Sequence, residues 1–262
     1  MIINPYFFGD PDVQAFLTAT GITDPTITSA ITTLVAGLKS NNLWTKMKAV
    51  YPFVGGTATT HKYNLKDPQD TNAAFRLTFN GGVTHNSNGA TFNGTNGYAD
   101  TYLSPSGALT ANSNHLSLYS RTSAQRVSGS NDMGMGDNIA GNNSIVFCIR
   151  RPGDVCYYLN NAILISTSNL NGQGLYIGTT RANNDRKYFK NTLSLGTSTT
   201  LYNQVLTNFN FYIGAYNAGG VASTYADFQT AFASIGDGLN DTEATNFYNL
   251  IQTFQTTLSR QV

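Results

Sequence analysis

Apolar positions along the chain follow two different periods, and the change between them comes at about residue 50. Before that point apolar residues recur at the three- and four-residue spacing of a helix. After it they occur in short or alternating runs bounded by turn residues. A second helical pattern closes the chain from residue 240 onward. We therefore expect a small helical segment over residues 1–50 and a β domain with a closing helix over residues 51–262.

The N-terminal segment contains one well-marked helix. Asp24 followed by Pro25 is typical of an N-cap and a first helical position. The apolar residues of one helical face follow, namely Ile27, Ile31, Leu34, Val35 and Leu38. A shorter helix around Phe16 is expected before it, ending near Gly21, and a third short turn is expected over residues 43–50. The apolar face must be covered by the β domain or by a partner chain.

The region after residue 50 predicts short strands joined by tight turns. Five Asn-Gly pairs, a strong turn signal, start at positions 80, 88, 93, 96 and 171. The candidate strands are residues 51–54, 73–79, 98–103, 115–121, 144–150, 155–159, 162–166, 174–179, 187–189, 209–215 and 229–234. This succession favours an antiparallel sandwich or barrel over a parallel sheet.

The closing helix has a capping box. Asn240 is the expected N-cap, and Glu243 follows three residues later. One face of the helix is formed by Ala244, Phe247, Tyr248, Ile251, Phe254 and Leu258. The pattern is too short for sustained heptads, so we expect this helix to pack on the sandwich rather than to form a coiled-coil stem.

Composition agrees with a mainly β chain and excludes several partners. Asn, Thr, Ser and Gly supply 108 of the 262 residues, and only 11% are charged. Glu and Lys, which fill exposed helix faces, are scarce. A net charge of +1 without a basic run argues against nucleic acid. No apolar stretch approaches the roughly 20 residues of a membrane span. The N-terminus lacks a signal-peptide pattern, so any export is expected to follow another route.

The two cysteines are expected to be free thiols. Cys148 and Cys156 flank a predicted hairpin whose turn is residues 151–154. In that hairpin Cys148 lies opposite Tyr157, and Cys156 points to the other face of the sheet. A disulfide between them is geometrically poor. No Cys/His spacing predicts a zinc site.

No catalytic residue is predicted. Glycoside hydrolysis usually needs two carboxylates, and the nearest pairs, Asp67/Asp70 and Asp132/Asp137, lie in turn-like segments where Asp bonds the backbone. The three histidines, His61, His85 and His115, accompany no nucleophile signature and are expected to be surface or satisfied histidines. The glycines of residues 133–137 lack nucleotide-binding spacing.

Two loops are candidates for binding. Oxygen side chains at Asn131, Asp132, Asp137 and Asn138 could hold calcium, although the EF-hand order is missing and a flexible loop is the alternative. The densest basic patch could bind an acidic glycan or a phosphate, through Arg181, Asp185, Arg186 and Lys187, with Lys190 nearby. Its alternative is a solvated hairpin edge whose charges discourage strand pairing.

The remaining surface is neutral and hydroxyl-rich. Amide and hydroxyl groups can bond the hydroxyls of a ligand, and tyrosine supplies rigid contact area. The same surface suits packing against neighbouring subunits, and the residues leave both possibilities open.

Several segments resemble virion proteins of tailed bacteriophages. The N-terminal part, from INPYFFG (residues 3–9) to residue 79, is similar to the N-terminal part of those proteins. Five later segments resemble the concanavalin A-like (laminin-G-like) jelly roll that those proteins carry. They are GATFNGTNGYADTYL (89–103), HLSLYSRT (115–122), LYIGTTRANNDRKYFKNTLSLGTST (175–199), FYIGAYNAGG (211–220) and FASIGDGLNDTEATNFYNLIQTFQTTLSRQV (232–262).

The resemblance implies a mainly β fold, a concanavalin A-like jelly-roll sandwich with a small N-terminal helical segment and a C-terminal helix. It also implies a structural or adhesive role on a phage particle. Glucanases of this fold carry a cluster of Glu and Asp on one strand, and this chain has none. We therefore expect a protein that is not an enzyme.

The leading hypothesis is a non-enzymatic virion protein that recognises host-surface glycans on the tail or fibre. Residues 1–50 would attach it to other virion proteins, and many copies or a homo-oligomer would act through avidity. No cofactor is expected apart from the calcium candidate. The alternatives are a decorating subunit of capsid or tail without a ligand and, third, a polysaccharide-degrading enzyme.

Overall fold

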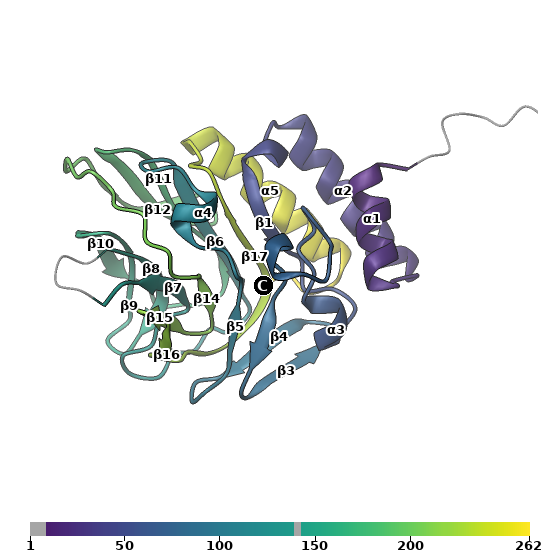
Figure 1. Cartoon of the computed structure of the whole chain (residues 1–262), viewed down its shortest axis with the longest axis horizontal. Coiled ribbons are helices and arrows are strands. Elements are labelled where there is room, and N and C mark those ends of the chain that lie inside the picture. Colours follow the sequence, from purple (N-terminus) through teal and green to yellow (C-terminus); the bar gives the residue numbers. More distant parts are fainter. Residues whose placement is uncertain (1–8, 139–142) are drawn as a thin grey trace, which may run out of the picture.

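Two β-sheets and three long helices form the layers of the computed structural model, which describes residues 9–138 and 143–262. The sheets face each other as a sandwich, and the helices lie together on one side of it (Figure 1). This is the predicted jelly-roll sandwich with an N-terminal helical segment and a C-terminal helix. The two sheets do not close into a barrel.

The eight-stranded sheet has the order β13-β12-β11-β6-β17-β4-β3, and β1 pairs with β17 beside this path. Its pairings are antiparallel. Its strands are β1 (Met47–Tyr51), β3 (Val83–Asn86), β4 (Gly89–Asn93), β6 (Asn114–Ser120), β11 (Gly174–Ala182), β12 (Asp185–Lys190), β13 (Leu193–Ser198) and β17 (Asp227–Gly236).

The nine-stranded sheet has the order β10-β9-β8-β7-β14-β5-β2, with the β15–β16 hairpin joined through β15 to β7. The β15–β7 pairing is parallel. Its strands are β2 (Thr78–Asn80), β5 (Tyr98–Asp100), β7 (Met133–Gly136), β8 (Ser144–Arg151), β9 (Val155–Asn160), β10 (Ile163–Ser168), β14 (Tyr212–Ile213), β15 (Tyr216–Ala218) and β16 (Val221–Ser223).

The N-terminal helices begin and end as the sequence predicts. The carboxylate of Asp24 accepts hydrogen bonds from the backbone N–H groups of Thr26 and Ile27, which caps α2 (Pro25–Ser40). The preceding helix, α1 (Pro11–Thr20), ends at Gly21 with a φ of 66°, a conformation that favours glycine. Short helical turns complete the set: α3 (Ala58–His61), α4 (Pro105–Ala108), and 3₁₀ turns at Trp44–Lys46 and Asn72–Ala74.

The closing helix, α5 (Asp241–Thr257), has the predicted capping box between Asn240 and Glu243. The Glu243 carboxylate also lies 2.6 Å from the Lys46 ammonium, so the chain's sole glutamate joins the helix start to the segment before β1. No helix in the described residues is long and apolar enough to span a membrane.

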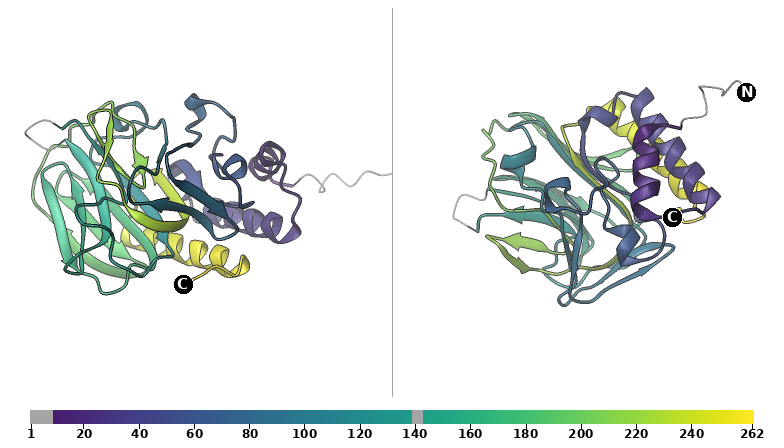
Figure 2. Two further views of the ribbon diagram at one scale, coloured as in Figure 1. Left: turned by 90° about the horizontal axis from the view of Figure 1, so that it is seen from below. Right: turned by 45° about the vertical axis from the view of Figure 1, so that its right-hand side comes forward.

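Two apolar cores hold these layers together. The inner core lies between the sheets and includes Phe92, Phe147 and Tyr188. The outer core lies between the eight-stranded sheet and the helices, where Ile31 of α2 and Phe247 of α5 are fully buried. Figure 2 shows α1, α2 and α5 gathered on this side. The long helices therefore cover the eight-stranded sheet and leave the outer face of the nine-stranded sheet free of them.

Two predicted elements are wrong in detail. The expected third helical turn over residues 43–50 is a 3₁₀ turn followed by β1, because residues 47–51 pair with β17. The expected strand over residues 73–79 is a 3₁₀ turn followed by the short β2. Both segments are apolar and short, and a distant strand decides their conformation, which local patterns do not reveal.

The hairpin of the two cysteines is confirmed. Cys148 of β8 pairs directly with Tyr157 of β9, and Cys156 contributes to the inner core. Both thiols are free and buried. Burial raises the pKa of the Cys156 thiol to about 11, so it is protonated and unreactive at neutral pH.

The predicted division at residue 50 falls within β1, three residues after that strand begins to pair with β17 at Met47 and one before it ends. Whether the two parts fold separately stays a prediction. Residues 3–8 of the segment that resembles phage proteins lie outside the described residues.

Candidate functional site

A group of tyrosines occupies the outer face of the nine-stranded sheet. On β5, Ala99 points into the inner core, so strand alternation places Tyr98 and Asp100 on the opposite, outer face. Tyr212 of β14 is the cross-strand partner of Asp100, and Ile213 beside it belongs to the inner core. Tyr212 and Asp100 therefore share the outer face. We call Tyr98, Tyr102, Tyr212 and Tyr225, with Asp100 among them, the tyrosine cluster.

The rings of the tyrosine cluster form a tilted stack that is partly exposed. The ring centroids of Tyr98 and Tyr212 are 4.7 Å apart with an interplanar angle of 34°. Tyr98 and Tyr225 are 6.3 Å apart at 49°. Tyr212 is only 7% exposed, whereas Tyr98 and Tyr225 are half-buried. The buried ring of Tyr212 thus supports Tyr98, and Tyr98 and Tyr225 present ring surface to solvent.

Asp100 provides hydrogen-bond acceptors within the cluster. Its Oδ1 accepts from the backbone N–H of Tyr102 at 2.8 Å and from the side-chain amide of Asn210 at 3.1 Å. Its Oδ2 has only a long contact of 3.4 Å to the same amide. Burial raises the pKa of Asp100, and the Tyr102 and Asn210 donors oppose that shift. Oδ2 is therefore the oxygen with most capacity left for a ligand.

The phenols of Tyr98 and Tyr212 are protonated at neutral pH, so each can donate a hydrogen bond. Burial, followed by the nearby Asp100 carboxylate, raises the pKa of Tyr212 to about 12. The same two causes raise the pKa of Tyr98. The cluster therefore combines ring surface, phenolic O–H donors, a carboxylate acceptor and an amide, and this combination can bond a hydroxyl-rich ligand while packing against its C–H groups.

Three residues of this cluster carry a signal in the sequence pattern. Tyr98, Asp100 and Tyr102 stand at alternate positions of the strand predicted over residues 98–103, which places polar aromatics and a carboxylate on one face. Tyr212 lies in the strand predicted over residues 209–215. Tyr225 lies outside every predicted strand, so only the three-dimensional structure brings it in.

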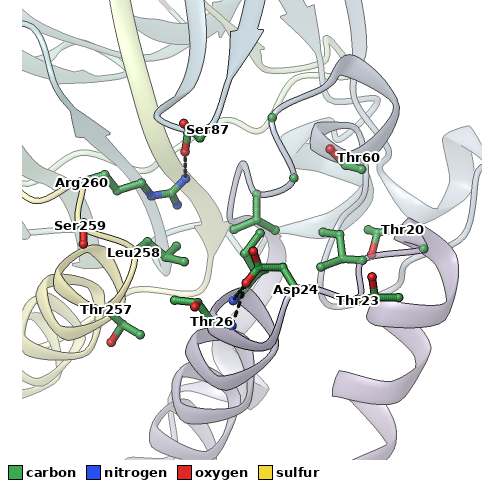
Figure 3. A pocket seen from close by; sticks show the side chains of 16 residues that line it. Thr20, Thr23, Asp24, Thr26, Thr60, Ser87, Thr257, Leu258, Ser259 and Arg260 are labelled. Atoms are coloured by element: carbon green, nitrogen blue, oxygen red, sulfur yellow. Dashed lines mark hydrogen bonds between the residues drawn. The ribbon is translucent and has the colours of Figure 1, made fainter.

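A cavity of about 600 Å³ lies elsewhere, where the helices meet the sandwich (Figure 3). Its walls come from the α1–α2 turn, the loop after β1, Ser87 and the end of α5. Figure 3 shows threonine and serine hydroxyls, Asp24 and Arg260 around it. The cavity is large enough for a small polar molecule.

The charged groups of this cavity are already used by the fold. Arg260 is 1% exposed, and its guanidinium donates to four backbone carbonyls and to the side chain of Gln255. Burial lowers the pKa of Arg260 to about 9, so it stays charged at neutral pH. Asp24 caps α2 through its carboxylate. Arg260 thus fastens the chain end to the sandwich, and for this reason the cavity ranks below the tyrosine cluster as a binding site.

The residues of the predicted basic patch lie together, but two of its cations pair with neighbouring carboxylates. Arg181 pairs with Asp185 at 2.5 Å, and Lys187 pairs with Asp241 at the start of α5 at 2.6 Å. Arg186 is fully buried and donates to backbone carbonyls. These contacts fasten the β11–β12 hairpin to itself and to α5. Ligand binding at this patch stays a prediction.

The predicted calcium loop is divided between different partners. The Asp132 carboxylate lies 2.7 Å from the Arg126 guanidinium, and both side chains are fully buried. Asn131 contacts Thr224 and Tyr157. The described residues contain no group of three or more His, Cys, Asp or Glu side chains able to hold a metal.

The other two candidates of this loop lie at its far end. Asp137 accepts a hydrogen bond from the side-chain amide of Asn143, and Asn138 has a φ of 57°. Asp132 is thus withdrawn from the loop into its buried ion pair, and calcium binding by the remaining oxygens stays a prediction.

The histidines and the other aspartate pair have structural partners. The Nδ1 atoms of His61 and His85 are 3.0 Å apart, and His61 Nε2 accepts from the backbone N–H of Gly56. Burial, with further effects from His85 and Arg260, lowers the pKa of His61 to about 3. Asp70 pairs with Lys62 at 2.6 Å, while Asp67 accepts from Gln69.

The comparisons with known proteins give the fold and no family. No family model and no curated protein matches the chain. Domain 4 of AbnA, a GH43 extracellular arabinanase from Geobacillus stearothermophilus solved with arabinotriose, is 15% identical with a TM-score of 0.56; the match covers 77% of this chain and 98% of that domain. A mutant Trypanosoma rangeli sialidase displaying trans-sialidase activity is 12% identical with a TM-score of 0.52, over 87% of this chain and 39% of that one.

These neighbours show that the chain has a β-sandwich fold, and they correct one prediction. The expectation that the chain is not an enzyme is contradicted, because the neighbours are a domain of an arabinanase and a sialidase variant with trans-sialidase activity. The missing Glu and Asp cluster excluded only the mechanism of one group of glucanases. It did not exclude the other chemistries that a β-sandwich can carry.

Proposed function

We propose that this chain is a carbohydrate-binding β-sandwich whose glycan site is the tyrosine cluster. The observation that carries the proposal is the pair of partly exposed rings, Tyr98 and Tyr225, beside the hydrogen-bonding groups of Asp100 and Asn210. They lie on the outer sheet face that the long helices leave free. The cavity beside Arg260 offers hydroxyls but no comparable ring surface.

The chemistry of saccharides matches this surface. One side of a pyranose or furanose ring presents C–H groups, which pack on aromatic rings, and its edge presents hydroxyls that both donate and accept. Tyrosine rings supply rigid contact area at a low cost in conformational entropy. The structure of the arabinanase domain with arabinotriose supports the same class of ligand for this fold.

In its finer form the proposal places the chain on a phage particle. The resemblance of its segments to virion proteins supports this setting, with host-surface glycan and other virion proteins as partners. Many copies on one particle would convert weak single sites into firm attachment. A decorating subunit without a ligand is the competing hypothesis. Labelled-antibody electron microscopy of intact particles separates them, because tail or fibre label favours host recognition and capsid label favours decoration.

Binding of purified protein to a panel of immobilised glycans tests the proposal directly. We expect Tyr98→Ala to weaken binding about tenfold or more, since one supporting ring contact is worth roughly 1.4 kcal/mol or more at a binding hot spot. Tyr202→Ala is the matched control, because Tyr202 is also half-buried but lies outside the cluster. If no glycan binds, or if both variants lose binding equally, the proposed site is wrong.

The same samples test for hydrolysis. Reducing ends released from oligosaccharides that bind would show that the chain also cleaves its ligand. Repeating the assay with Asp100→Asn then asks whether the carboxylate of the cluster takes part in cleavage.

A further inference from the structure

We propose that Asp100 makes the tyrosine cluster selective for neutral saccharides over saccharides that carry a carboxylate, such as sialic or uronic acids. The inference rests on the glycan-binding function proposed above and names the ligand class of that site.

Asp100 lies at the centre of the cluster. Its cross-strand neighbours are Tyr212 of β14 on one side and Thr78 of β2 on the other. Such neighbours have Cβ atoms about 5 Å apart. Tyr98 and Tyr102 stand two residues before and after it on the same chain segment. A sugar that packs on the exposed part of the Tyr98 ring therefore lies within reach of this carboxylate.

The charge of Asp100 has no cationic partner. Within residues 9–138 and 143–262 it forms no ion pair, and its hydrogen-bond donors, Tyr102 N–H and the Asn210 amide, are neutral. The cation beside the cluster is Arg76, whose guanidinium lies 5.9 Å from the centre of the Tyr102 ring. Arg76 is already shared with Asp70, at 3.4 Å. The cluster therefore has a negative centre.

A negative centre distinguishes the two ligand classes. A sugar hydroxyl donates to Asp100 Oδ2, which has most of its acceptor capacity free. A carboxylate in the same place donates nothing and meets a like charge in a partly desolvated setting, where repulsion is stronger than in water. A neutral saccharide therefore gains a charge-assisted hydrogen bond to Asp100, whereas an acidic saccharide is repelled by the same carboxylate.

The ring geometry argues against an organic cation as the ligand. An aromatic cage for an ammonium group needs rings that enclose a space. The Tyr98 and Tyr212 rings lie 4.7 Å apart at 34°, which is a stack without room for a group between them. The cluster is a platform, and a saccharide ring suits it better than a quaternary ammonium does.

Pairs of oligosaccharides that differ only in a terminal sialic or uronic acid test the inference. For wild-type protein we expect at least about tenfold tighter binding of the neutral member, a difference of about 1.4 kcal/mol. Asp100→Asn keeps the shape of the side chain and removes its charge, so it should bring the ratio toward one. Asp67→Asn, outside the cluster, is the matched control and should keep the wild-type ratio.

A second measurement needs no variant. Salt screens repulsion between charges, so raising the ionic strength should strengthen binding of the acidic member and leave the neutral member nearly unchanged. This test applies even if Asp100→Asn fails to fold, which its melting curve would reveal.

The outcomes separate the two proposals. Equal or tighter binding of the acidic glycan by wild-type protein overturns the selectivity while the glycan-binding function stands. An unchanged ratio in folded Asp100→Asn overturns the role of this residue. Displacement of the neutral glycan by choline would show a cation site and overturn the inference. Absence of binding to every glycan rejects the proposed function itself.

Discussion

His115 is a buried histidine whose ionisation opposes folding. Its Nδ1 lies 2.6 Å from the carbonyl oxygen of Asp237, and its Nε2 lies 3.0 Å from the hydroxyl of Ser234. The side chain is fully buried, and burial lowers its pKa from 6.5 to about 4. The imidazole is therefore neutral in the folded protein and serves packing and hydrogen bonding.

This shift predicts acid sensitivity. Because the pKa of His115 is lower in the folded state, the unfolded chain binds the extra proton first as the pH falls. Its contribution to stability is complete above pH 6.5 and is lost between pH 6.5 and about 4. We expect the loss to approach 1.4 kcal/mol per pH unit in the middle of that range. Urea unfolding at several pH values measures it.

The control for this prediction is His115→Asn, which cannot titrate in this range. The variant starts from a lower stability, so the slopes are compared rather than the absolute free energies of unfolding. A slope for the variant as steep as that of wild-type protein would assign the acid sensitivity to other groups, such as His61.

At the same scale, the charged residues that stand out in the sequence form ion pairs within the fold. Arg126 and Asp132 form a buried pair, and Arg181 pairs with Asp185. The sequence shows that such residues are close along the chain, but it does not show which carboxylate each cation pairs with. The tyrosine cluster was missed for the opposite reason. Tyr98 and Tyr102 are close in sequence, but Tyr212 and Tyr225 come from distant segments, and only strand pairing joins Asp100 to Tyr212.

At the scale of the elements, the sequence correctly predicted the features that residues close in sequence determine. The helix caps at Asp24 and Asn240 and the hairpin of β8 and β9 are confirmed, because each is set by residues within a few positions. The strands β3 and β4 were missed because they are polar on the exposed side and lie among Asn-Gly pairs, where turn signals mask the alternation. β3 pairs with β4, and the pairing of β4 with β17 is long-range and could not be predicted from pattern alone.

The cap of α5 gives a prediction at the scale of an element. The Asn240 side chain accepts from the backbone N–H of Glu243, and the Glu243 carboxylate accepts from the N–H of Asn240. Asn240→Ala removes the first bond and leaves a helix-end donor unsatisfied, at a cost of about 1 kcal/mol in the free energy of unfolding. Chemical denaturation measures this loss.

Two matched variants show whether the loss comes from the cap. Asn240→Ser keeps a capping oxygen and should cost much less. Asn249→Ala changes the same residue type at an exposed position within α5 and should be nearly neutral. Equal losses in Asn240→Ala and Asn240→Ser would argue that a contact other than the cap is responsible.

At the scale of the whole molecule, one sheet is shared by two cores. The eight-stranded sheet faces the inner core on one side and the helices on the other, so its central strands, such as β6 and β17, are buried on both faces. The nine-stranded sheet is buried on one face and presents the tyrosine cluster on the other. This asymmetry assigns the helical side to stability, and it leaves the opposite side for the proposed glycan site.

The shared core predicts what removal of the N-terminal helices does. Deleting residues 1–45 removes α1 and α2, and it uncovers the apolar surface, Leu250 of α5 included, against which Ile31, Leu34 and Val35 of α2 are buried in the intact chain. Large apolar surface of this kind costs about 25 cal/mol per Å² when returned to water. We therefore expect the truncated chain to aggregate or to lose its sharp thermal transition.

Deleting residues 1–21, which removes α1 alone, should be milder, because α1 contributes only Val13 and Phe16 as buried residues. Thermal melting of the two truncations separates the possibilities. A sharp transition after deletion of residues 1–45 would instead establish the division near residue 50 as a true domain boundary, with the helices as a separable attachment segment.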